Sequence, residues 1–123
     1  MISGTLIAES LRLNESLDRV PLTVTKITRL GPLGDTSIGQ PSVWTFVEST
    51  TEDEFAAELA ESLADAIDPV LGWYCDFRTD DETFVAFSDE VFRYKRGDPE
   101  GRGEAAAYAR LVGVPESQID WPE

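Results

Sequence analysis

The chain has 123 residues, of which 41% are hydrophobic and 28% charged, and its formal net charge is −14. This length and composition predict a single folded domain, residues 1–123. The charge argues against binding to nucleic acid or to an anionic membrane, because like charges repel. The chain has no histidine, which excludes Ser–His and Cys–His catalysis and removes the commonest metal ligand.

The negative charge is concentrated in the middle of the chain. Residues 48–92 carry fourteen acids and a single base, Arg78, whereas the segments before and after them are close to neutral. Such a distribution repels phosphates and attracts basic partners. Its simplest interpretation is solubility, and its functional interpretation is a surface for a basic protein partner.

The N-terminal residues MISGTLIAES lack the basic and apolar regions of a secretion signal, and no apolar run reaches bilayer length. The chain has one cysteine, which permits no internal disulfide and fits a reducing compartment. These features predict a cytoplasmic protein that does not enter a membrane.

Two strands are expected at the start of the chain, over residues 2–13 and 22–30. Both show apolar residues at every second position with a change of phase, after Ser10 in the first and between Val24 and Ile27 in the second. A β-bulge produces such a change. The polar linker Asn14–Pro21 favours an antiparallel pair of these two strands.

The segment Gly31–Ser42 has no periodicity and contains three glycines and two prolines, with Leu33 and Ile38 as its only anchoring side chains. A loop of this length is either a mobile connector or a flap over a ligand. Val43–Glu48 then forms a strand that is apolar on both faces, which is typical of a central strand.

The clearest helix follows this strand. Thr51 and Glu54 have the spacing of a capping box, and an apolar stripe then recurs every four residues, at Phe55, Leu59, Leu63 and Ile67. Asp68-Pro69 ends the helix, because the residue before proline avoids the helical conformation. Its opposite face is acidic.

Residues Gly72–Tyr94 predict three short strands joined by acidic turns. Strand alternation places Trp73, Cys75 and Phe77 on one face, where Cys75 is expected to be a buried thiol. The other face carries the candidate binding residues, which are Tyr74, Asp76 and Arg78. An aspartate with a raised pKa beside an arginine fits a small-molecule site, and the alternative is an ion pair on the solvent face of the sheet.

The chain, and its GWYCDF stretch at residues 72–77 in particular, resembles a family of small acidic bacterial proteins with no assigned activity. This resemblance implies no catalytic, metal-binding or cofactor-binding residue.

A second helix is expected after Asp98-Pro99, which supply an N-cap and a first helical residue, and it is expected to end at Gly113. Gly101 and Gly103 weaken its first turn, so that a start nearer Arg102 is an alternative. The tail contains Ile119 and Trp121, and we expect both to dock onto the domain.

The order β-β-β-α-β-β-β-α predicts an α+β fold, with a mainly antiparallel sheet and both helices packed on one side of it. The favoured function is a non-enzymatic binding module for a basic protein partner, with exposed aromatic residues at Tyr74, Tyr94 and Trp121.

The alternative is a small-molecule-binding protein or enzyme with a pocket between sheet and helices, lined by Trp44, Trp73, Phe84 and Tyr108 and anchored by Asp76 and Arg78. Self-assembly through a sheet edge is a third possibility. No catalytic residue, metal site or cofactor is predicted.

Overall fold

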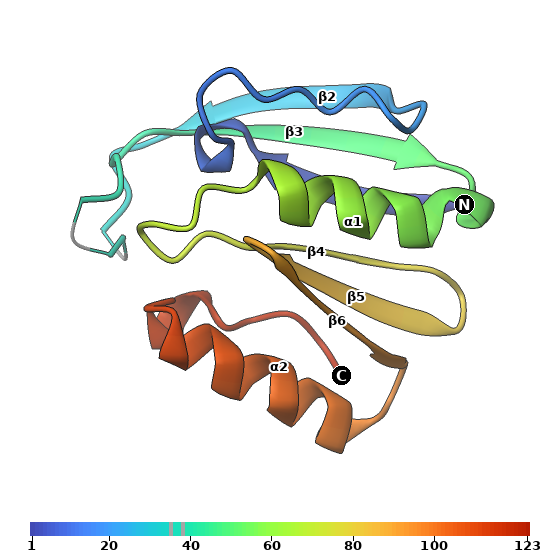
Figure 1. Ribbon diagram of the computed structural model, residues 1–123. Coiled ribbons are helices and arrows are strands. Elements are labelled where there is room, and N and C mark those ends of the chain that lie inside the picture. Colours follow the sequence, from blue (N-terminus) through green and yellow to red (C-terminus); the bar gives the residue numbers. More distant parts are fainter. Residues whose placement is uncertain (35, 38) are drawn as a thin grey trace.

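The computed structural model describes residues 1–34, 36–37 and 39–123, and Ile38, one of the two expected loop anchors, lies outside them. The two helices and six strands follow the order β-β-β-α-β-β-β-α (Figure 1). Their bounds are β1 Ile2–Ile7, β2 Thr23–Leu30, β3 Trp44–Thr51, α1 Ala56–Ala66, β4 Cys75–Arg78, β5 Glu82–Phe87, β6 Glu90–Lys95 and α2 Pro99–Leu111.

All six strands form one antiparallel sheet in the spatial order β2-β3-β1-β4-β5-β6. The α+β class, the antiparallel sheet and the order of elements are therefore confirmed. β3 lies inside the sheet, as its two apolar faces predicted, and β2 and β6 form the two edges.

The predicted pairing of the first two strands is wrong. β1 lies at the centre of the sheet, between β3 and β4, and β2 pairs only with β3. The chain leaves the sheet at a 3-10 turn over Ala8–Ser10, where the Ser10 hydroxyl donates to Ile7 O at 2.6 Å. This turn also explains the phase change after Ser10, where we predicted a bulge. The bulge predicted in β2 is present, between Val24 and Lys26.

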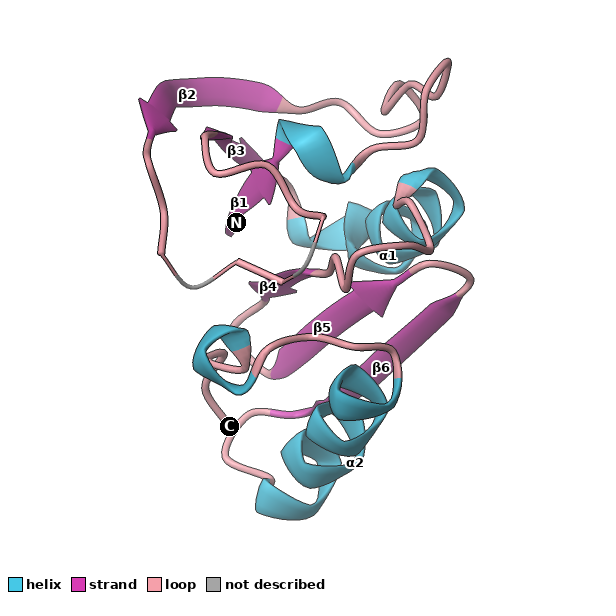
Figure 2. Ribbon diagram, turned by 90° about the vertical axis from the view of Figure 1, so that its left-hand side faces the viewer, coloured by secondary structure: helices cyan, strands magenta, loops and turns pink. Residues whose placement is uncertain are grey.

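Both helices contact the sheet, but they lie on opposite faces of it rather than on the one side that we expected (Figures 1 and 2). The cause is β5, whose residues Thr83–Phe87 are all buried. Phe84 and Ala86 face α1, whereas Val85 and Phe87 face α2. A strand that is apolar on both faces requires a cover on each side.

The molecule therefore has two hydrophobic cores separated by the sheet. The α1 core contains, among others, Ile2, Leu59, Leu63, Ile67, Phe77 and Phe84. The α2 core contains, among others, Val85, Phe87, Tyr94, Ala105, Ala109, Ile119 and Trp121. The predicted docking of the tail is confirmed, because Ile119 and Trp121 are buried.

The helix ends follow the sequence signals in part. Asp98 caps α2, since its carboxylate accepts from Glu100 N at 3.1 Å, and Gly113 follows the helix with a φ of +91°. The capping box predicted for α1 is wrong. A 3-10 turn over Asp53–Phe55 precedes α1, and the Thr51 hydroxyl instead donates to Pro21 O at 2.7 Å.

Candidate functional site

The sheet face opposite α1 carries a groove beside the C-terminal segment, because α2 covers only the β5–β6 end of that face. This groove, which we call the carboxylate groove, has a volume of about 450 Å³. It is lined by Thr5, Ile7, Leu33, Trp44, Phe46, Gly72, Trp73, Tyr74, Cys75, Asp76, Ser117, Gln118 and Asp120. Its size lies within the range of ordinary ligand sites, roughly 300–1,000 Å³.

The structure brings two of the three predicted site residues together in this groove. Tyr74 and Asp76 line it, whereas Arg78 lies beside Asp76 in a shallow neighbouring depression. No salt bridge joins Asp76 to Arg78 among the described residues. The surface ion pair that was the alternative interpretation of these residues is therefore not formed.

Tyr74 connects the groove to the C-terminal segment. Its hydroxyl lies 2.9 Å from Asp120 Oδ1 and within hydrogen-bond distance of Gln118 O. Its ring packs edge-on against Trp121, with 5.0 Å between the centroids. Burial and the neighbouring Asp120 raise the pKa of Tyr74 well above its ordinary value, so this hydroxyl stays protonated and donates its hydrogen.

Asp76 is a half-buried carboxyl group of the groove. Burial, together with the nearby Asp120 carboxylate, raises the pKa of Asp76 from 3.8 to about 6, and Arg78 opposes this shift. Two carboxylates that share a partly dry site favour a proton or another cation between them. A positively charged group in the groove would therefore stabilise Asp76 in its ionised form.

Aromatic side chains form the wall of the groove next to β3. Trp44 and Trp73 meet edge to face with 5.3 Å between their centroids, and Phe46 lies 6.1 Å from Trp44. Aromatic faces attract cations as well as apolar groups. None of the described residues that line the groove is a lysine or an arginine.

The described part of the loop over residues 31–42 borders the groove through Leu33. Gln40 Nε2 and the Ser37 hydroxyl both donate to Leu71 O, at 2.5 and 2.8 Å. Gln118 Nε2 donates to Gln40 Oε1 at 3.2 Å, which joins the loop to the C-terminal segment. The choice between a connector and a flap over a ligand stays a prediction.

Other predicted roles are corrected by the structure. Tyr94 and Trp121 were expected as exposed contact residues, but they are 7% and 2% exposed because they pack in the α2 core. Phe84 and Tyr108 were expected beside Trp44 and Trp73 in one pocket. Phe84 lies in the α1 core, and Tyr108 packs against the α2 core on the opposite face of the sheet.

The buried thiol predicted at Cys75 is confirmed, and burial raises its pKa to about 12. Asp120, Phe46 and Thr5 were not recognised from the sequence as groove residues. For Asp120 a signal existed, since it stands between Ile119 and Trp121, the two residues expected to dock.

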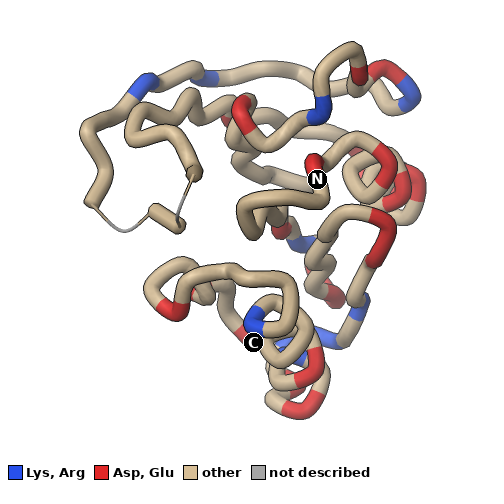
Figure 3. The backbone as a smooth tube through the Cα atoms, turned by 60° about the vertical axis from the view of Figure 1, so that its left-hand side comes forward, with Lys and Arg blue, Asp and Glu red and all other residues tan. Residues whose placement is uncertain are grey.

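Most of the acidic residues lie on other surfaces. Figure 3 shows acidic positions along α1 and the neighbouring turns. The charged residues of β2 are both basic, namely Lys26 and Arg29. A depression of about 300 Å³ between the start of α1 and the β4–β5 turn is lined by Asp53, Glu54, Ala56, Ala57, Thr79, Asp80, Asp81, Glu82 and Arg93. Glu82 is bound there by Arg93 through two hydrogen bonds of 2.5 and 2.7 Å.

Comparisons with protein-family models, with curated proteins and with solved structures found no match for this chain. The resemblance to a bacterial family therefore stays a prediction. Within the residues that the structure describes, neither helix is long and apolar enough to cross a membrane.

Proposed function

We propose that this protein is a non-enzymatic binding module that recognises a basic protein partner. In this proposal the carboxylate groove receives a lysine or arginine side chain of the partner, and the acidic surface around α1 accelerates their encounter. The observation that carries the proposal is the composition of the groove. Asp76 and Asp120 both line it together with aromatic side chains, and none of its described lining residues is basic.

Each part of the groove matches one part of a cationic side chain. Trp44, Phe46 and Trp73 suit the alkyl stem and attract the charge through their ring faces. The carboxylates of Asp76 and Asp120 suit the ammonium or guanidinium group, with charge-assisted hydrogen bonds. Arginine is also among the residues that contribute most at protein interfaces.

The remaining negative charge acts at longer range. Exposed carboxylates on α1 without a salt bridge among the described residues include Glu58 and Glu61. Complementary fields of this kind raise the association rate and weaken as salt screens them. In this proposal the groove therefore slows dissociation of the partner, and the charge on α1 speeds its association.

The experiment measures binding of lysine-rich and arginine-rich peptides by stopped-flow tryptophan fluorescence, since Trp44 and Trp73 line the groove. The groove variant is D76N/D120N, and the matched variant E58Q/E61Q removes the same charge from α1. We expect the groove variant to raise the dissociation rate about tenfold or more, which corresponds to about 1.4 kcal/mol or more. The α1 variant should lower mainly the association rate and its dependence on salt.

Equal effects of the two variants on the dissociation rate would contradict the groove as the anchor, and an absence of peptide binding at low salt would contradict the proposal. A free diamine such as cadaverine is the comparison ligand. If it binds as tightly as the peptides, the alternative of a small-molecule-binding protein is favoured, because the peptide backbone then contributes nothing.

A further inference from the structure

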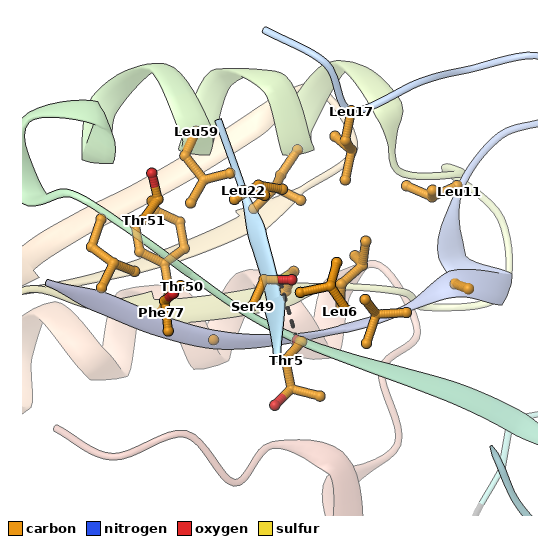
Figure 4. A pocket seen from close by; sticks show the side chains of 17 residues that line it. Thr5, Leu6, Leu11, Leu17, Leu22, Ser49, Thr50, Thr51, Leu59 and Phe77 are labelled. Atoms are coloured by element: carbon orange, nitrogen blue, oxygen red, sulfur yellow. Dashed lines mark hydrogen bonds between the residues drawn. The ribbon is translucent and has the colours of Figure 1, made fainter. Parts of the chain in front are cut away.

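A second pocket lies on the other face of the sheet, between α1 and strands β1, β2 and β3 (Figure 4). Its volume is about 260 Å³. Its lining includes six leucines, which are Leu6, Leu11, Leu17, Leu22, Leu59 and Leu63. We call it the apolar pocket.

Two small residues in the middle of the sheet create this space. Gly4 of β1 pairs with Ser49 of β3, and Ser49 pairs on its other side with Val24 of β2. A Cβ atom at Gly4 would lie 3.2 Å from Phe77 Cβ, so β4 leaves little room for a larger residue at this position. The pocket is therefore deep at these two small residues, whereas the neighbouring positions carry the larger side chains of leucine and valine.

The lining determines what can occupy the pocket. None of the lining residues is charged. Two of its polar groups already have partners: the Thr51 hydroxyl donates to Pro21 O at 2.7 Å, and the Cys75 thiol lies 3.5 Å from Thr5 O. Water needs several polar partners and leaves apolar cavities empty, whereas apolar molecules enter them.

The segment from Leu11 to Leu22 forms a lid over this pocket and contributes three of its leucines, which Figure 4 shows above the sheet. Two arginines attach the lid near its ends. Arg12 Nε donates to Ile67 O at 3.0 Å, and Arg19 donates to the Ser62 hydroxyl at 2.9 Å and to Asp65 at 3.0 Å. Between them Leu13 is 92% exposed, whereas Leu17 is half-buried and packs against the core.

We propose that the apolar pocket binds an uncharged hydrocarbon group, either an alkyl chain or a small ring system, and that the Leu11–Leu22 lid admits it. The pocket is open to solvent beside β2, where its lining residue Val24 is 52% exposed, so a hydrocarbon that enters it removes apolar surface from water. An apolar cavity of ~150 Å³ accepts benzene, so the larger pocket accepts a larger hydrocarbon. This site does not depend on the carboxylate groove or on a basic partner.

The test uses the neutral dye N-phenyl-1-naphthylamine, whose fluorescence rises in apolar surroundings, with 1-decanol and decanoate as competitors. S49L fills the pocket from its floor, and S3L adds the same side chain at an exposed position of β1 outside it. We expect the wild type to bind the dye, decanol to displace it more strongly than decanoate, and S49L to bind it at least tenfold more weakly. S3L should bind it like the wild type, and R19A should exchange it faster because the lid loses an attachment.

Thermal unfolding establishes that each variant is folded. Decanol should raise the melting temperature of the wild type but not of S49L, because a ligand stabilises only the state that binds it. Failure of the wild type to bind the dye, equal binding by folded S49L, or stronger displacement by decanoate would overturn the proposal. So would a stable dimer whose dissociation exposes the dye site, since a second copy would then be the occupant.

Discussion

Replacing Asp76 by asparagine tests the electrostatics of the carboxylate groove. The pKa of Asp76 is raised from 3.8 to about 6 in the folded protein, mainly by burial. Between these two pH values the folded state binds more protons than the unfolded state, so the stability that depends on this proton is lost as the pH rises through about 6. Each tenfold change in proton affinity corresponds to about 1.4 kcal/mol. The full difference is therefore about 3 kcal/mol, and partial exposure of the side chain reduces it to about 2 kcal/mol.

Asparagine has no charge to bury, so D76N should lose this pH dependence. The free energy of unfolding of D76N minus that of the wild type should be about 2 kcal/mol larger at pH 7.5 than at pH 3.5. For 123 residues this corresponds to roughly 8 °C in melting temperature. The assay is urea denaturation followed by tryptophan fluorescence at several pH values, with D18N as a control on an exposed aspartate. A stability difference that stays constant from pH 3.5 to 7.5 would refute the reasoning.

Three further predictions concern the fold and are measured by urea denaturation. G72A should destabilise the protein by about 2 kcal/mol, because Gly72 has a φ of +70° and an added Cβ would lie 2.7 Å from Gly113 O; an unchanged midpoint would mean that the two loops separate easily. F84A should cost about 3–5 kcal/mol, since Phe84 is buried and stacks on Phe77 at 4.9 Å, and a loss below 1 kcal/mol would show that the α1 core collapses around the gap. D98A should cost about 1 kcal/mol through loss of the α2 cap, whereas D98N should retain most of it.

The sequence predicted the elements well because each has a local cause. The apolar stripe of α1, the cap at Asp98 and the apolar run of β5 all depend on neighbouring residues. The errors concern long-range arrangement. The pairing of β1 with β3 and β4 depends on a turn at Ala8–Ser10 and on segments more than thirty residues away. The turn leaves only a change of phase that a bulge also explains, and the distant segments leave no periodic signal.

The candidate site was predicted in part for the same reason. Alternation correctly placed Tyr74 and Asp76 on the face opposite Cys75. It did not predict that Asp120 would become the second carboxylate, because that contact depends on how the tail crosses the sheet. Burial is the main cause of the raised pKa of Asp76 and Asp120 adds to it, and both causes depend on tertiary structure.

The two pockets lie on opposite faces of the same two strands, and strand register keeps them distinct. Gly4 and Phe77 pair with each other and line the apolar pocket, whereas Asp76, the neighbour of Phe77, lines the carboxylate groove. A slip of one residue in β4 would place Asp76 among the leucines and Phe77 beside the carboxylates. The free-energy cost of burying an unpaired charge far exceeds the free energy that binding of a ligand in either pocket contributes. A Cβ at position 4 would lie 3.2 Å from Phe77 Cβ, so the pairing that keeps the two sites on opposite faces also favours glycine at position 4.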